Sequence, residues 1–418
     1  MEPKELYHRI FGIDAPWQIT TVELPNDRSE VVVRVVRTAD VPATCPICGK
    51  VSSGYDTRSR RWRHLDTCQY PTYVEAEIPR VRCPEHGVHQ LRVPWAEEGS
   101  GFTALFESLV IDWLQCASSS EVARMMGLSW NAVDRIQQRA VRRGLQRRQS
   151  SDGASGSMVH LSIDEIAVKK GHRYVTVVSD QSSGGVIAVL DGRTKETLVA
   201  FFATLSQAER ASIKTISLDM WPAYISAITE SIPEAEQKIC YDRFHIAQHL
   251  NRAVDHVRRQ EHRRLMKDQD ERLKKTRYLW LRNPDQMSDE QWQRFAALRT
   301  SRLVSARAWV LKEEAMGIFS ECEDQQTAEH QWQWWYSWAI RSRIDPLKKV
   351  ARMIKRHLQG VINAIVYRRT NALAESINAA ISKLKRRAHG YRNTERLKNA
   401  ILFHRGKLDL YPAPGLPT

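Results

Sequence analysis

Two pairs of soft metal ligands constrain the first part of the 418-residue chain. They lie in Cys45-Pro-Ile-Cys48-Gly and Cys83-Pro-Glu-His86-Gly. A two-residue gap lets both side chains of a pair reach one ion, and the glycine that follows permits a tight turn. The sequence therefore predicts one structural zinc ion, Zn²⁺, in a closed tetrahedral site formed by Cys45, Cys48, Cys83 and His86. By spacing alone, His64 and Cys68 are competing ligands.

Strand-forming runs surround these ligands, for example over residues 30–36 and 72–78. Residues 1–100 are therefore expected to form a small, strand-rich zinc-ribbon domain. The odd number of cysteines, seven, in a chain without a signal-like start favours metal ligation over a disulfide framework. No apolar stretch approaches the roughly 20 residues of a membrane span. These features predict no membrane association and a cytoplasmic location.

Residues 101–150 have the pattern of a helix-turn-helix domain, with two helices around Gly127 and Ser129 as the N-cap of the second. The second helix is predicted to enter a major groove. Base contacts are assigned to Trp130, Asn131 and Arg135, and phosphate contacts to Arg139, Arg142 and Arg143. An ordinary helical hairpin has the same pattern, but the arginine-rich end of the second helix favours a DNA-binding domain. Residues 149–157 have the composition of a flexible linker and predict a domain boundary.

Beyond this segment, strand-like runs over 158–164, 173–179 and 185–191 precede a helical pattern and two further runs that end at Asp219 and Asp242. This order predicts a mixed sheet of the ribonuclease H type over residues 157–243. Strand alternation places Asp164 on the face of His160 and Ser162, with Glu165 on the other face. Asp164 and Asp219 both lie at carboxyl ends of predicted strands, where open sheets place their ligand sites.

A third acid, Glu375, lies on a predicted helix that also carries Asn371 and Asn378 on the same face. Oxygen ligands from three carboxylates suit Mg²⁺ or Mn²⁺. Two such ions can activate a water or a 3′-hydroxyl group and stabilise the leaving oxygen of an in-line displacement. Asp242 is the rival of Asp219 for the second acid. Asp219 is favoured because it ends the fourth strand, which lies beside the first in this fold type.

Residues 244–365 are almost entirely helical in pattern and rich in tryptophan, and residues 366–418 contain the Glu375 helix and a basic tail. The formal net charge of +15 favours a polyanionic partner. Within the basic tail, Lys385, Arg386 and Arg387 are assigned to DNA phosphates because they follow the Glu375 helix, although a charge run is usually a solvated face. The tryptophans at 332–338 are expected to form core or a dimer contact, in preference to a base-stacking platform.

These motifs closely resemble those of the DDE transposases of bacterial insertion sequences, specifically the ISL-three family. The resemblance extends over nearly the whole chain. It rests on the cysteine ribbon, the helix-turn-helix, Ile163-Asp-Glu, Lys170-Gly-His-Arg-Tyr-Val-Thr-Val-Val, Asp219-Met-Trp-Pro-Ala-Tyr, Asp242-Arg-Phe-His-Ile and Asn371-Ala-Leu-Ala-Glu-Ser-Ile-Asn378. His86 stands where the family pattern usually has a fourth cysteine.

The resemblance implies a multidomain α+β protein. A zinc ribbon and a helix-turn-helix precede a ribonuclease H-like mixed α/β catalytic domain, which is interrupted by an all-helical insertion over residues 244–365. It also implies that Asp164, Asp219 and Glu375 are the catalytic acids and bind the two Mg²⁺ or Mn²⁺ ions of each active site. Asn371, Asn378, Asp242 and His245 are then supporting residues around them.

The activity implied by the resemblance is DNA transposition. The N-terminal domains bind terminal inverted repeats in double-stranded DNA, and the acids cleave the element's ends and transfer the 3′-hydroxyl groups to target DNA. A homodimer in the paired-end complex and a location at the bacterial nucleoid are implied as well. The alternative is a catalytically inactive, transposase-derived regulator that binds specific DNA. A junction-resolving nuclease explains the acids but leaves the N-terminal domains without a role.

Overall fold

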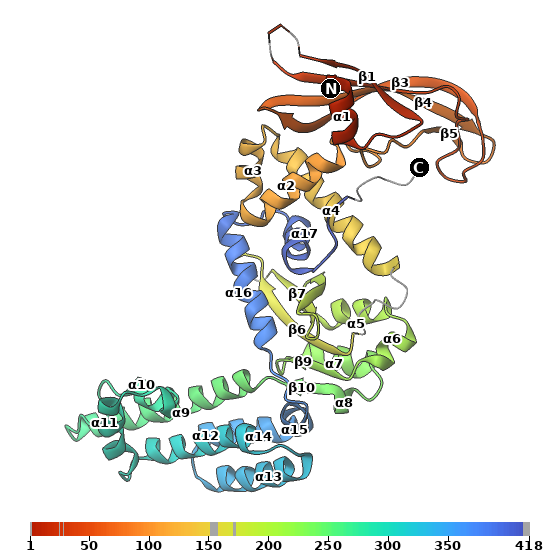
Figure 1. Cartoon of the computed structure of the whole chain (residues 1–418). Coiled ribbons are helices and arrows are strands. Elements are labelled where there is room, and N and C mark those ends of the chain that lie inside the picture. Colours follow the sequence, from red (N-terminus) through yellow and green to blue (C-terminus); the bar gives the residue numbers. More distant parts are fainter. Residues whose placement is uncertain (1, 25, 28, 151–157, 170–172, 413–418) are drawn as a thin grey trace. The chain divides into compact units, whose positions relative to one another are not determined.

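The computed structural model of the chain describes residues 2–24, 26–27, 29–150, 158–169 and 173–412 (Figure 1). The chain divides into two compact units, unit 1 (Met1–Asp152 with Leu408–Thr418) and unit 2 (Gly153–Lys407). Residues 151–157 of the expected linker, and Lys170 to His172 of the family motif, lie outside the described residues. The segment from Leu408 belongs to unit 1, which differs from the expectation that all of residues 366–418 belong to the catalytic domain.

Unit 1 begins with a strand-rich part. Its elements are α1 (Pro3–Phe11), β1 (Trp17–Glu23), β2 (Val31–Arg37), β3 (Ser53–Thr67), β4 (Tyr70–Cys83) and β5 (Gly87–Gln90). The strand order is β1-β2-β4-β3, and β5 also pairs with β4. The strand-forming runs at 30–36 and 72–78 correspond to β2 and β4, which pair in parallel. Alternate residues of β4, including Val74 and Ile78, are buried against Trp62 and Trp95.

The second part of unit 1 is helical, with α2 (Ala104–Cys116), α3 (Ser119–Met125) and α4 (Trp130–Ser150). The Ser129 hydroxyl accepts a hydrogen bond of 3.2 Å from the backbone N–H of Ala132, which confirms this residue as the cap of α4. Gly127 has φ +61, in the left-handed region that the turn requires. Val122, Val133 and Ile136 are fully buried, as the helix-turn-helix pattern predicts.

Unit 2 contains a five-stranded mixed sheet. Its strands are β6 (His160–Ala167), β7 (Tyr174–Asp180), β8 (Gly185–Asp191), β9 (Thr215–Leu218) and β10 (Ile239–Tyr241), in the order β10-β9-β6-β7-β8. The first three strands pair antiparallel, whereas β9 pairs in parallel with both β6 and β10. All five strands were expected from the sequence.

Helices cover both faces of this sheet. They are α5 (Lys195–Ala203), α6 (Gln207–Ser212), α7 (Pro222–Ser231), α8 (Ala235–Lys238), α16 (Ala372–Arg387) and α17 (Thr394–Arg405). Leu161 and Ile163 of β6 pack in the core that contains α5 and α7, while Ile166 packs with α16 and α17. The alternation of β6 therefore directs Ser162 and Asp164 toward the face of α16.

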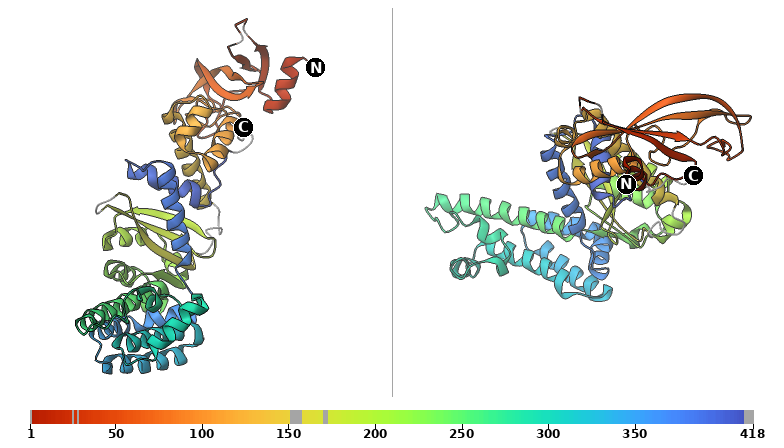
Figure 2. Two further views of the ribbon diagram at one scale, coloured as in Figure 1. Left: turned by 90° about the vertical axis from the view of Figure 1, so that its left-hand side faces the viewer. Right: turned by 45° about the horizontal axis from the view of Figure 1, so that its top comes forward.

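An all-helical segment separates β10 from α16 in the sequence. It comprises α9 (Arg243–Lys267), α10 (Arg277–Leu281), the 3₁₀ turn η1 (Pro284–Gln286), α11 (Asp289–Arg299), α12 (Val304–Glu321), α13 (Gln325–Arg341), α14 (Asp345–Arg356) and α15 (Leu358–Val366). Helix α9 runs beside α12 and α14 (Figure 2). Trp280, Trp332 and Trp335 are fully buried, so these tryptophans form core as predicted, while Trp334 is exposed. Within the described residues, no helix has the length and apolar character needed to cross a membrane.

Candidate functional site

The four predicted zinc ligands come together in unit 1. The ligand atoms of Cys45, Cys48, Cys83 and His86 all lie within 4.8 Å of one another. The Cys48 and Cys83 sulfur atoms are 3.8 Å apart, and Cys83 Sγ is 3.5 Å from His86 Nδ1. A tetrahedral zinc ion with bonds of about 2.3 Å to sulfur requires edges of about 3.8 Å. The geometry therefore fits a closed structural zinc site.

Local backbone geometry prepares this cluster. Gly49 and Gly87, which follow the two ligand pairs, have φ values of +71 and +78. These left-handed conformations turn the chain so that both members of a pair face the same point. A hydrogen bond with His86 lowers the pKa of Cys83 to about 6, which favours the thiolate that binds metal.

The two competing zinc ligands lie elsewhere. His64 is buried, and its Nδ1 is 2.8 Å from the Thr103 hydroxyl oxygen. Its ring centre lies 4.1 Å from that of Phe11 with the two rings tilted by 41°, and burial lowers its pKa to about 4. Cys68 is exposed and is not part of the cluster. The structure therefore selects the four-ligand set from the alternatives that spacing left open.

Asp164 and Asp219 lie on neighbouring parallel strands of unit 2. Asp164 is part of β6 and Asp219 directly follows β9, whose Ile216 and Leu218 point into the opposite core. Backbone and side-chain donors orient both carboxylates. Asp164 accepts hydrogen bonds from Glu165 N at 2.8 Å and from Asn378 Nδ2 at 2.7 Å, and Asp219 accepts one from Trp221 N at 2.8 Å.

The charge of Asp219 affects the pKa values of the neighbouring carboxyl groups of Asp164 and Glu165. Burial raises the pKa of Asp164 above its ordinary value, and the negative charge of Asp219 raises it further. Burial, with the charges of Asp219 and Asp164, also raises the pKa of Glu165 to about 6. In the described part of the chain neither Asp164 nor Asp219 forms an ion pair. The site therefore concentrates negative charge that a cation can compensate.

The Glu375 helix is fastened to the strand of Asp164. Asn371, directly before α16, is buried and accepts a hydrogen bond from Ser162, and Asn378 bonds to Asp164. Glu375 lies between them on the helix and is exposed. No group of described acidic side chains gathers its ligand atoms within 4.8 Å, so Glu375, Asp164 and Asp219 are not drawn into such a cluster in this form.

The two remaining expected site residues have different surroundings. The His245 charge lowers the pKa values of Asp164 and Glu165, so His245 lies near the carboxylates. Asp242 caps α9 by accepting a hydrogen bond of 3.1 Å from Phe244 N. It is 4% exposed, and its Oδ2 has no hydrogen-bond partner among the described residues. The charge of Asp219 contributes to the raised pKa of Asp164.

Four of the six residues assigned to DNA on α4 are exposed, namely Trp130, Asn131, Arg135 and Arg142. The assignment of Arg139 and Arg143 to phosphates is corrected by the structure. Arg139 Nε donates at 3.0 Å to Glu107, which is 1% exposed, and Arg143 Nη2 donates to the same carboxylate at 3.2 Å. Arg143 is itself buried and also pairs with Glu97. A buried carboxylate requires such partners, so both arginines serve the core of unit 1.

Comparison with known sequences covers each of these parts. Residues 41–86 match the zinc finger of insertion-sequence transposases, residues 91–141 match the helix-turn-helix domain of transposase family ISL3, and residues 161–401 match the DDE transposase domain of that family. The chain belongs to the ISL3 family of DDE transposases. It is therefore a DNA transposase, an enzyme that cleaves DNA and transfers strands.

Similar proteins are themselves transposases. The transposase for insertion sequence element IS1557 of Mycobacterium tuberculosis is 31% identical over 95% of this chain and 94% of its own length. The transposase for insertion sequence element IS1001 of Bordetella parapertussis is 29% identical over 91% of this chain and 93% of its own length. No solved structure matches the chain.

The basic stretch that follows Glu375 was expected to form one DNA-facing surface, but several of its side chains contact other parts of unit 2. Lys385 Nζ donates to the Ala167 carbonyl at 2.5 Å, and Arg387 is half-buried beside His404. Lys398 pairs with Asp191 at 2.9 Å. Lys385 and Lys398 thus connect α16 and α17 to the sheet of unit 2, and the assignment of Lys385 and Arg387 to DNA stays a prediction. Arg386 is exposed and keeps its assignment as a prediction.

Several residues near the carboxylates of the transposase were not singled out from the sequence. The guanidinium group of Arg193 lies 3.9 Å from the Tyr174 ring centre and 4.9 Å from that of Trp221, and 3.6 Å from Glu165. The Tyr224 hydroxyl is 2.7 Å from that of Thr176, and burial and the three nearby carboxylates raise its pKa. Trp221 and Tyr224 belong to the motif that begins at Asp219, which was a signal for them. Arg193 had none.

Proposed function

We propose that Asp164, Asp219 and Glu375 are the catalytic acids of the transposase and that Asn371, Asn378, Asp242 and His245 support them. The single observation that carries this proposal is the double attachment of the Glu375 helix to β6 through Ser162–Asn371 and Asp164–Asn378. The helical spacing of Asn371 and Asn378 places Glu375 between these attachments. Asp219 is the second acid because its charge acts on Asp164.

The donor set fits divalent metal ions. Hard carboxylate oxygens are the ligands that Mg²⁺ and Mn²⁺ accept, and each of these oxygens keeps a lone pair beyond its hydrogen bond. Burial and the charge of Asp219 raise the pKa of Asp164, so a bound cation would favour its charged form. Two ions bound here would activate a water or a 3′-hydroxyl oxygen and stabilise the leaving oxygen.

The chain's own residues supply orientation. The N–H groups of Asn378 and Glu165 each hold one oxygen of Asp164, and the N–H of Trp221 holds Oδ1 of Asp219. Such fixed donors keep the carboxylates in one geometry, which lowers the reorganisation required when DNA binds. We propose that the reaction is cleavage at the element's ends followed by transfer of the 3′-hydroxyl groups to target DNA.

The N-terminal unit is proposed to recognise the terminal inverted repeats. Trp130, Asn131 and Arg135 are exposed at the start of α4, where a recognition helix meets base edges, and Arg142 lies further along to meet a phosphate. We propose one zinc ion at the cysteine and histidine cluster, where it stabilises the ribbon and takes no part in cleavage.

We further propose that the sheet of unit 2 is ribonuclease H-like, interrupted by α9–α15. The strand order β10-β9-β6-β7-β8, in which only β7 runs antiparallel to the other four strands, supports this assignment. The transposase is proposed to act as a homodimer that pairs two element ends, at the nucleoid in the bacterial cytoplasm. Its relatives come from bacteria, which supports the cellular setting.

Cleavage of a plasmid carrying both element ends tests the site. Asp164→Asn, Asp219→Asn and Glu375→Gln are expected to abolish Mg²⁺- or Mn²⁺-dependent strand cleavage while end binding, measured separately, persists. Asp242→Asn is the comparison, and is expected to reduce the rate of cleavage without abolishing it, because Asp242 is proposed to support the acids and not to bind the metal ions. Loss of cleavage in Asp242→Asn with normal cleavage in Asp219→Asn would reverse the choice of second acid. End binding by the wild-type protein without any cleavage would favour the inactive regulator.

A further inference from the structure

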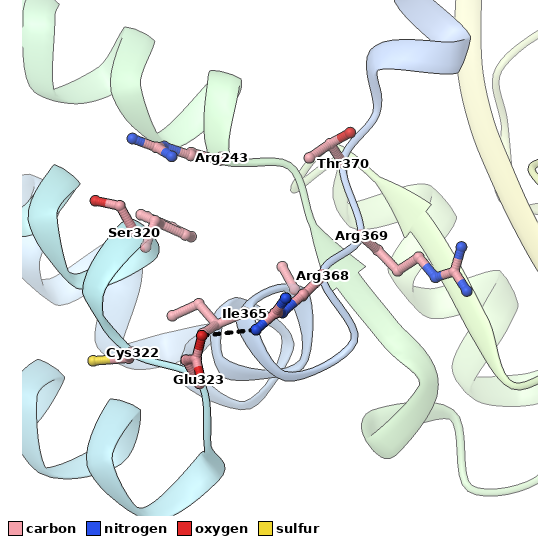
Figure 3. A pocket seen from close by; sticks show the side chains of 10 residues that line it. Arg243, Ser320, Cys322, Glu323, Ile365, Arg368, Arg369 and Thr370 are labelled. Carbon is pink, nitrogen blue, oxygen red and sulfur yellow. Dashed lines mark hydrogen bonds and ion pairs between the residues drawn. The ribbon is translucent and has the colours of Figure 1, made fainter.

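An arginine-lined cavity lies in unit 2 where the sheet meets the helical insertion (Figure 3). Its volume is about 320 Å³. The walls come from the first residue of α9, the end of α12 and the segment that joins α15 to α16. The charged residues among them are Arg243, Glu323, Arg368 and Arg369. Three arginines and one glutamate thus line this concave surface.

Arg243 and Arg368 stand on different walls of the cavity. Figure 3 shows Arg368 directed at Glu323, Arg243 near Ser320 on the other side, and Arg369 turned away toward the sheet. Arg243 forms no ion pair with a described acid. Its Nη2 is 3.5 Å from the Met316 carbonyl oxygen, and its guanidinium group lies 5.7 Å from the Phe319 ring centre. Its guanidinium group therefore has no carboxylate partner among the described residues.

The one carboxylate of the cavity is held weakly. Arg368 Nη2 donates to Glu323 Oε1 at 2.8 Å, but the two side chains are 73% and 78% exposed. Ion pairs this exposed contribute little, because water screens them. Guanidinium groups bind phosphate oxygens through paired, charge-assisted hydrogen bonds. A phosphate that also meets Arg243 can therefore replace Glu323 at Arg368.

Both walls continue directly into the candidate active site. Arg243 follows Asp242 and precedes His245 by two residues, a backbone span of at most about 7 Å. The charge of His245 acts on Asp164. On the other wall, Arg368 precedes Thr370, whose carbonyl accepts a hydrogen bond of 3.1 Å from Gln181, and Asn371, which bonds to Ser162. The cavity is thus adjacent to the carboxylates along the polypeptide on both sides.

We propose that Arg243 and Arg368 clamp one backbone phosphate of the DNA strand that enters the carboxylate site. Glu323 holds Arg368 in place when DNA is absent and releases it when the phosphate binds. The identity of the strand rests on the proposed function, whereas the affinity for a phosphate rests on the cavity alone. The cavity is at the small end of ligand sites, which suits one phosphate group and not a base pair.

A methylphosphonate scan tests this clamp with the full-length transposase. Duplexes carrying the element end, each with one phosphate near the cleavage position made neutral, are titrated without added Mg²⁺ or Mn²⁺ and without a chelator, so that the zinc site is kept intact. We expect one such position to weaken wild-type binding and to have no effect on the Arg243→Ala/Arg368→Ala variant. That variant should also reduce the slope of log affinity against log salt by about 0.9, the value for one phosphate contact. Glu323→Gln should bind the unmodified duplex several-fold more tightly.

Arg352→Ala is the matched control, because it removes an exposed arginine from α14, outside the cavity. Thermal unfolding of each variant verifies folding. If every neutralised position affects the double variant as it affects the wild type, the clamp does not exist. Inorganic phosphate is also tested as a competitor of DNA. If it competes for the wild type but not for the double variant, while the methylphosphonate scan is the same for both proteins, the cavity is a site for free phosphate and the DNA assignment is wrong. Binding without Mg²⁺ or Mn²⁺ requires no catalysis, so failure of the proposed active site would instead appear as absent cleavage by the wild type when these ions are added.

Discussion

Asn378 donates a hydrogen bond of 2.7 Å to Asp164, which precedes it by 214 residues in the sequence. The bond joins α16 to β6 across the whole helical insertion. Asn371 forms the second connection by accepting a hydrogen bond from Ser162. These two hydrogen bonds therefore connect parts of the proposed site that the whole insertion separates in the sequence.

Asn378→Ala is expected to reduce DNA cleavage by about 10- to 100-fold and to raise the Mg²⁺ concentration required for half-maximal rate. Residues that orient metal-binding carboxylates typically have effects of this size. Cleavage rates over a series of Mg²⁺ concentrations measure both changes. Ser382→Ala, at an exposed position of the same helix, should retain wild-type behaviour. An unchanged metal requirement in Asn378→Ala would show that this amide does not prepare Asp164.

Removal of zinc is expected to unfold the ribbon of unit 1. Structural zinc contributes about 10–16 kcal/mol of binding free energy in zinc-finger peptides, which is comparable to the whole stability of a domain. The purified transposase should contain about one zinc per chain, and Cys83→Ser or a chelator should abolish end binding. Metal analysis and circular dichroism measure these outcomes. Cys68→Ser, an exposed cysteine outside the cluster, should keep its zinc and its fold.

Local patterns in the sequence predicted the elements well. The periods of two in β6 and β9 identified which residues share a face, and Gly127 and Ser129 identified the turn and the cap of α4. The two ligand pairs, each with a two-residue gap, predicted the zinc cluster, because local backbone geometry sets the positions of both ligands of a pair. These features succeed because their physical causes lie within a few residues.

Long-range packing was the part that local patterns could not predict. Arg139 and Arg143 had the spacing of a basic DNA-facing surface, but Glu107 of another helix attracts both into the core. Lys385 continued a charged run, but it lies where it can reach a β6 carbonyl. Arg193 follows β8 and pairs with Glu165 of β6, although β7 lies between these two strands in the sheet. In each case the partner lies far away in the sequence.

The buried histidine of unit 1 predicts a pH dependence of stability. Burial lowers the pKa of His64 from an ordinary value of 6.5 to about 4, so folding favours the neutral ring. The stabilisation is fully present above pH 6.5 and is lost as the pH falls from 6.5 to 4, by about 2–3 kcal/mol. His64→Asn retains a polar atom near Thr103 but cannot be protonated. The unfolding free energy of the wild type should therefore fall relative to that of the variant as the pH is lowered. A difference between the two proteins that does not change with pH would contradict this assignment.

The segment after Lys407 is expected to stabilise unit 1. Leu410 is 4% exposed, its carbonyl accepts a hydrogen bond from Arg143, and the Tyr411 hydroxyl donates to Asp112 at 2.7 Å. Leu410→Ala should destabilise unit 1 by about 2 kcal/mol or more, because it empties a packed position. Asp409→Ala removes only a partly exposed ion pair with Arg147 and should cost less than about 1 kcal/mol. Hydrogen exchange measures both: Leu410→Ala should speed exchange in α2 and α4 and leave α12 unchanged. Equal exchange in the two variants would show that the tail does not contribute to the stability of the DNA-binding unit.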